Sequence, residues 1–142
     1  MAYEMPILDI SQDTASTNFL QYRVVTVSGA GVVHTTAASG VRALGVSQAA
    51  PTASTSSTGT SVPIRVYGVS KVEASSLAVA RGNYLRATSG AVAAGSRLGG
   101  TVRPTTNATQ FVIGIALTSC AAGTGRRYIS MLLTHAGRCS TA

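Results

Sequence analysis

Histidine, cysteine, aspartate and glutamate are the usual residues of acid–base and metal sites, and only five of them lie after residue 17. They are two histidines (His34, His135), two cysteines (Cys120, Cys139) and the one carboxylate, Glu73. A zinc site or an acid–base pair needs several such groups held together, and a Ser–His–Asp triad would lack its Asp. We therefore expect a protein that is not an enzyme, with no catalytic residue, no metal and no cofactor. The two histidines are expected at the surface or in an interface.

The glycine motifs do not predict a phosphate site. "GAG" (29–31) and "GTG" (123–125) are not followed by a helical pattern, which a phosphate-binding loop requires. "GTGRR" (123–127) is instead typical of a hairpin connection, with Arg126 and Arg127 exposed.

Charge is scarce and unevenly placed. Charged residues make up 11% of the chain, with eleven basic residues and four acidic ones. Three of the acids, Glu4, Asp9 and Asp13, precede residue 18, where there is no basic residue. A basic body indicates a nucleic acid or an acidic protein surface as partner, although scattered solvated charges explain it equally well. So little charge also favours assembly with other subunits.

No targeting or membrane segment is predicted. The sequence has no apolar run of the length that a transmembrane helix needs, and its acidic start does not match a secretory signal. We expect synthesis in a cytoplasm and no membrane partner. Two cysteines do not form a disulfide framework, and the sequence leaves open whether Cys120 and Cys139 pair.

The elements that position these residues are β-strands. "FLQYRVVTV" (19–27) and "VRALGVSQA" (41–49) are rich in β-branched residues, and "VPIRVYGVSKVEA" (62–74) alternates apolar and other residues. No amphipathic helical pattern of ten residues occurs. The predicted fold class is all-β, a small barrel or sandwich.

The strand pattern occurs twice. "VRALGVSQAA" (41–50) is echoed by "FVIGIALTSCAA" (111–122), each with a glycine before a β-branched residue, Gly45 and Gly114. Residues 82–137 repeat the order of residues 18–74, which predicts two related β-units in one body (18–142) with these glycines at equivalent places. The alternative is two unrelated series of β-strands in a sequence of low complexity.

Residues 1–17 are predicted to form an extended N-terminal arm. Pro6 disfavours helix, and the segment combines large apolar residues with acids but no basic residue. Alone it buries too little to offset its ordering entropy. We expect it to become ordered on another chain, near basic groups of that chain; the alternative is a disordered tail.

In their order, these segments resemble the capsid cement, or head decoration, proteins of tailed bacteriophages, a family long filed as a domain of unknown function. The resemblance rests on "MAYEMP", "SGAG", "RALGVSQAAP", "VPIRVYGVSKVEA", "LAVARGNYLRATSGAVAAG" and "FVIGIALTSCAAGTGRRYISMLLTHAG". It covers most of the chain, although "TASTSSTGTS" and "RLGGTVRPTTNAT" depart from the family pattern.

The resemblance implies a structural protein on the exterior of the virion capsid. Such a protein binds the phage head, typically as a homotrimer, and stabilises the expanded shell by clamping neighbouring major capsid subunits. The candidate contacts to the capsid or to a sister subunit lie in the arm and before the last strand: Tyr3, Glu4, Met5, Ile7, Leu8, Asp9, Ile10, Arg126 and Arg127.

Two other functions are compatible with the residues. A basic β-barrel can bind single-stranded nucleic acid by stacking bases on aromatic rings, and five aromatics could form that platform: Tyr22, Tyr67, Tyr84, Phe111 and Tyr128. A virion surface adhesin domain is the other alternative.

Overall fold

The chain is an all-β protein. A computed structural model describes residues 2–15, 19–34, 42–50, 59–88, 99–106 and 110–138, with only the backbone of 135–138. Within these ranges there are strands and no helix, as the sequence predicted. The strands are β1 (Met5–Asp13), β2 (Val24–Ser28), β3 (Gly31–His34), β4 (Gly45–Ser47), β5 (Ser61–Ala74), β6 (Tyr84–Ala87), β7 (Val102–Pro104), β8 (Phe111–Ala116) and β9 (Arg127–Arg138).

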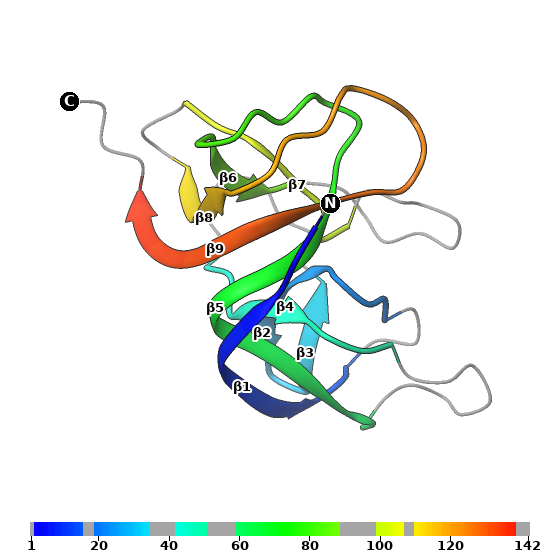
Figure 1. Cartoon of the computed structure of the whole chain (residues 1–142). Coiled ribbons are helices and arrows are strands. Elements are labelled where there is room, and N and C mark those ends of the chain that lie inside the picture. The colour runs from blue at the N-terminus through cyan, green and yellow to red at the C-terminus, as the bar shows by residue number, and fades with distance from the viewer. Residues whose placement is uncertain are drawn as a thin grey trace.

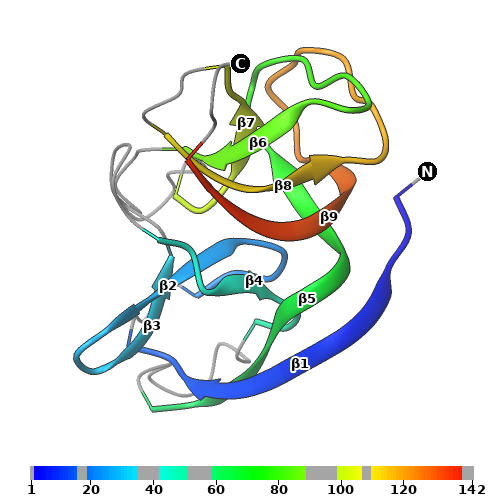
Figure 2. The same ribbon diagram turned by 90° about the vertical axis from the view of Figure 1, so that its left-hand side faces the viewer.

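The second half of the chain forms a closed barrel. The sheet follows the order β5-β7-β6-β8-β9, and β9 pairs again with β5. The long strand β5 crosses the molecule and contributes its second part to this barrel (Figures 1 and 2). Neighbours are antiparallel except β5 and β7, which run parallel at Ala74 and Val102.

The first half repeats this arrangement with β5 as its last strand. The order β3-β2-β4-β5 matches β7-β6-β8-β9, and β1 pairs with β5 as β5 pairs with β9. A parallel bridge between Thr14 and Val32 links β1 to β3. The Ala15 N–H donates to the Val32 carbonyl at 2.9 Å, and the Ser75 N–H donates to the Val102 carbonyl at 2.8 Å in the second unit. The two units therefore have the same strand order and share β5, which runs from one unit into the other (Figure 2).

Gly45 and Gly114 occupy corresponding places in this pattern. Gly45 pairs with Val25 of β2, and Gly114 pairs with Leu85 of β6. A Cβ on Gly45 would lie 2.2 Å from the Arg65 carbonyl oxygen, and one on Gly114 would lie 2.3 Å from that of Leu132. Real side chains do not approach so closely, so glycine is what lets the central strand of each unit lie against the long strand.

Corresponding positions also fill two separate cores. The first unit buries an apolar cluster of Phe19, Val25, Val32, Val62 and Ile64. The larger cluster of the second unit includes Val79, Leu85, Val102, Ile129 and Met131. Val24 and Val46 of the first unit join the larger cluster, which packs the units against each other.

The expected N-terminal arm is a strand of the first unit, and this corrects the prediction that it becomes ordered on another chain. β1 pairs with β5 of its own chain from Met5 opposite Val69 to Asp13 opposite Ser61. Ile10 packs against the first core. The entropy argument failed because it treated the segment as isolated, whereas the edge of β5 supplies hydrogen bonds and an apolar surface.

Candidate functional site

Half of the exposed large apolar side chains among the described residues lie on β1 or just before it. They are between 50% exposed (Tyr3, Leu8) and 65% exposed (Ile7), and Met5 lies within that range. Tyr67 of β5, directly opposite Leu8, is also half exposed. A surface of this kind usually marks an interaction site. We call these five residues, Tyr3, Met5, Ile7, Leu8 and Tyr67, the β1 surface.

A β-bulge sets the direction of these side chains. The pairing passes from Pro6 opposite Gly68 to Leu8 opposite Tyr67, so Ile7 is the extra residue. Gly68 has a φ of 110°, and a Cβ there would lie 2.5 Å from the Met5 oxygen and 2.8 Å from the Ile7 nitrogen. Only glycine permits this approach, and the bulge breaks the strict alternation that would otherwise turn one of the two neighbours inward.

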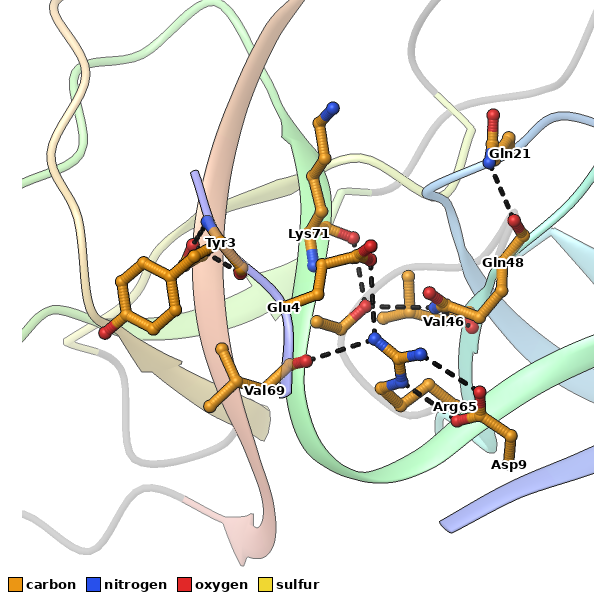
Figure 3. Close-up of polar contacts among 11 residues, drawn as sticks. Tyr3, Glu4, Asp9, Gln21, Val46, Gln48, Arg65, Val69 and Lys71 are labelled. Atoms are coloured by element: carbon orange, nitrogen blue, oxygen red, sulfur yellow. Dashed lines mark hydrogen bonds and ion pairs between the residues drawn. The ribbon is translucent and has the colours of Figure 1, made fainter. Parts of the chain in front are cut away.

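Arg65 holds β1 against β5. Its Nε and Nη2 donate to the two Asp9 carboxylate oxygens at 2.9 and 3.0 Å, while Nη1 donates to the Val69 carbonyl at 3.2 Å and reaches Glu4 Oε1 at 3.4 Å (Figure 3). The hydrogen bonds that Arg65 donates to Asp9 raise the pKa of Arg65 above its ordinary value. The Asp9 contact is bidentate, and the Arg65 side chain is buried while that of Asp9 is about one-third exposed. This geometry fixes the position of β1 more firmly than a fully exposed ion pair would.

The beginning of the chain is tied to the second unit. The Ser130 hydroxyl of β9 donates to the Tyr3 carbonyl at 2.7 Å, and the Tyr3 N–H donates back to that hydroxyl. The Lys71 N–H donates to Glu4 Oε1 at 3.4 Å. Residues 3–13 therefore span both units, as the course of β1 in Figure 1 shows.

A buried ion pair lies where the units meet. Arg23 Nη2 is 2.9 Å from Glu73 Oε2, and both side chains are almost fully buried. Arg23 Nη1 also donates to the Gly99 carbonyl at 2.8 Å. Burial lowers the pKa of Arg23 from its ordinary value, an effect that Glu73 opposes. The pair is structural, because its charged groups do not reach solvent.

Two tyrosines enclose a lysine beside this pair. The Lys71 ammonium lies 4.8 Å from the ring centroids of both Tyr22 and Tyr128. The two rings pack edge to face, with centroids 5.6 Å apart. Tyr128 lies opposite Glu73 in the β5–β9 ladder. The two cation–π contacts hold the Lys71 ammonium in one position beside both rings.

The two arginines predicted to be exposed before the last strand, Arg126 and Arg127, differ in their exposure. Arg126 is exposed, as expected, in the connection from β8. Arg127 begins β9, is only partly exposed, and donates from Nη1 to the Ala121 carbonyl. Arg126 is thus an exposed cation two residues before Tyr128, and Arg127 supports the connection itself.

His34 differs from its predicted surface position. It is buried and stacks on Phe19 with ring centroids 4.7 Å apart. The Leu20 N–H donates to His34 Nε2 at 2.9 Å, so the neutral ring is the acceptor. Burial lowers the pKa of His34 to about 4. The His135 side chain and Cys139 lie outside the described part of the chain.

The five aromatics of the nucleic-acid alternative are not on one strand pair. Tyr67 lies on β5 and Tyr84 on β6, strands that do not pair with each other. The Tyr22 and Tyr128 rings face Lys71, and the Arg42 guanidinium covers the Phe111 ring at 5.7 Å. The structure therefore brings together only Tyr22 and Tyr128.

The sequence analysis named most of the β1 surface, but it considered Tyr67 only as an aromatic of the nucleic-acid alternative and gave no role to Arg65 or Lys71. In residues 62–74, Arg65 and Tyr67 alternate with Val62, Ile64 and Val66, a pattern that predicts the two residues on the opposite face of the strand. What was lacking was the knowledge that β1 lies beside it.

In the residues that the structure describes, no cluster of three or more His, Cys, Asp or Glu side chains is placed to hold a metal ion. No helix long and apolar enough to cross a membrane occurs there either. Comparison with protein-family models, with curated proteins and with solved structures gives no match.

Proposed function

We propose that this protein is a structural virion protein that binds the outer surface of a phage head and stabilises the expanded capsid by clamping neighbouring major capsid subunits. The observation that carries the proposal is the β1 surface. Large apolar side chains are held outward by a strand that is itself fixed by Arg65, Asp9 and Ser130. The sequence resemblance to capsid cement proteins supports the same assignment.

A fixed surface is suited to clamping. A segment that folds only on its partner loses part of the binding free energy to ordering, whereas β1 is already ordered on β5. Its apolar side chains are then available for burial at about 25 cal/mol per Å². The shared strand β5 makes the two units a single body, so force applied at β1 passes to both cores.

We expect the protein to act as a homotrimer on the shell. Few charges and many small side chains favour close contacts between subunits, and the β1 surface gives each copy one apolar contact region. A reconstruction of the decorated head would show three copies meeting around one axis. Isolated single copies scattered on the shell would contradict this part of the proposal.

Binding to shells tests the function directly. Purified protein is mixed with expanded, DNA-free heads of the phage that carries it, and bound protein is measured by co-sedimentation. The double variant Ile7→Ser/Leu8→Ser keeps the strand pairing but removes apolar contact, so we expect affinity to fall about tenfold or more.

Leu77→Ser is the matched control. Leu77 is 51% exposed, like Leu8, but lies in the connection between β5 and β6. We expect its affinity for shells to equal that of the wild-type protein. Failure of the wild-type protein to sediment with expanded heads, or equal losses in both variants, would contradict the proposed function.

A further inference from the structure

Most acidic residues of this protein form ion pairs within the chain, so the charge left at its surface is mainly basic. Arg65 holds Glu4 and Asp9, and Arg23 holds Glu73. Three of the four acidic residues and two of the eleven basic residues in the sequence are thus paired with each other. Among the other described side chains, the exposed Asp13 is the remaining acid, whereas six basic residues reach the surface: Arg42, Lys71, Arg81, Arg103, Arg126 and Arg127. A partner that meets this surface is expected to bring carboxylates or phosphates.

One basic group of this surface is preorganised. Lysine is normally mobile, and ordering it weakens binding. Lys71 is instead held with its ammonium 4.8 Å from the centroids of both the Tyr22 and Tyr128 rings. Such contacts leave the N–H donors at the rim of the cluster available to an acceptor.

The backbone of Tyr22 supports a specific role for this cluster. Tyr22 is the one non-glycine residue with positive φ in the described ranges, at 59°. Gly82 occupies the corresponding place in the second unit: its N–H donates to the Ala116 carbonyl as the Tyr22 N–H donates to the Ser47 carbonyl. Glycine adopts this conformation without strain, so retaining tyrosine there indicates a use for the ring.

A second cation lies beside the cluster. Arg126 is exposed and precedes Tyr128 by two residues at the start of β9. It is also near enough to the buried Arg23 to help lower the pKa of that residue. We call Lys71, the two rings that contact it (Tyr22 and Tyr128) and the adjoining Arg126 the Lys71 patch.

The ring geometry favours carboxylates over nucleic acid. Bases bind single-strand platforms by stacking on open ring faces. Here both rings contact the Lys71 ammonium and pack edge to face on each other. We infer that the Lys71 patch binds the carboxylates of an acidic segment on a partner protein. The inference rests on the proposed function only in taking the major capsid protein as that partner.

Binding of a polyglutamate peptide to the full chain tests this without any shell. Amide chemical shifts are followed by NMR at low salt during titration. We expect the largest changes at Lys71, Arg126 and Tyr128, and we expect Lys71→Gln and Arg126→Gln each to weaken binding about fivefold. Arg81→Gln is the control, because Arg81 is exposed in the turn before β6, takes no part in the contacts that define the patch, and carries the same charge.

Each outcome decides the inference. Weakening confined to the two patch variants supports it, whereas equal weakening in Arg81→Gln shows a diffuse charge effect and overturns it. Tighter binding of an oligothymidylate at the same amides would assign the patch to nucleic acid and overturn it too. If the wild-type protein binds expanded shells but not the peptide, only the inference about the Lys71 patch is contradicted. If it binds the peptide but not the shells, only the proposed function is contradicted.

Discussion

Tyr22 and Gly82 stand at the same place in two copies of one strand-pairing pattern, and both have positive φ, 59° and 85°. In the second unit glycine meets the requirement directly. In the first unit a tyrosine adopts the strained conformation, and its ring contacts Lys71 and Tyr128. The fold therefore requires a positive φ at this place in both units, and the Tyr22 side chain adds the ring contacts in the first unit.

This relationship predicts an unusual order of stabilities. Tyr22→Ala loses the ring and keeps the strain, whereas Tyr22→Gly loses the ring and relieves it, so the glycine variant should be the more stable by about 1 kcal/mol. Gly82→Ala should lose a similar amount, because a Cβ there meets no atom within 4 Å and strain is its only penalty. Urea unfolding measures all three. An alanine variant at position 22 that matches or exceeds the glycine variant would contradict the argument.

Asp9→Asn should loosen β1 without unfolding the second unit. Arg65 is 6% exposed and would lose its bidentate carboxylate, at a cost of about 2 kcal/mol. We expect amide hydrogen exchange to accelerate across Met5–Asp13 and to remain slow in β6, β8 and β9. Glu4→Gln is the control, since its longer contact at 3.4 Å contributes under about 1 kcal/mol. Uniform acceleration in all strands would show that β1 does not open separately.

The repeat and the all-β class could be predicted from the sequence because both depend on local patterns. Gly45 and Gly114 both lie where a central strand closely approaches the long strand, and β-branched residues occur around them. The partner of the N-terminal segment could not be predicted, since strand pairing is decided by residues far apart in the chain. Asp9 pairs with Arg65 across 56 positions. The burial of His34 was missed for the same reason: its neighbour Phe19 comes from the segment before β2.

Glu73→Gln should be strongly destabilising, by about 3–5 kcal/mol, because it leaves the buried Arg23 guanidinium without a counter-charge. Asp13 supplies a control from the other unit. It precedes the Thr14–Val32 bridge as Glu73 precedes the Ala74–Val102 pair, yet Asp13 is exposed. Asp13→Asn should change the free energy of unfolding by less than about 0.5 kcal/mol. Similar effects of the two substitutions would mean that the buried ion pair contributes little.

His34 should make the protein less stable as the pH falls from neutrality. Its pKa in the folded protein is lowered to about 4 by burial, while an unfolded histidine titrates near pH 6.5. The unfolded state therefore binds the proton first, so the stability is fully present above about pH 6.5 and is lost as the pH falls toward 4, by on the order of 3 kcal/mol in all. Urea unfolding between pH 5 and 7.5 measures the slope, above the range where carboxylates titrate. His34→Gln, whose amide oxygen can still accept from Leu20, should flatten that slope even if it lowers the stability. A slope that persists in His34→Gln would assign the proton uptake to another group.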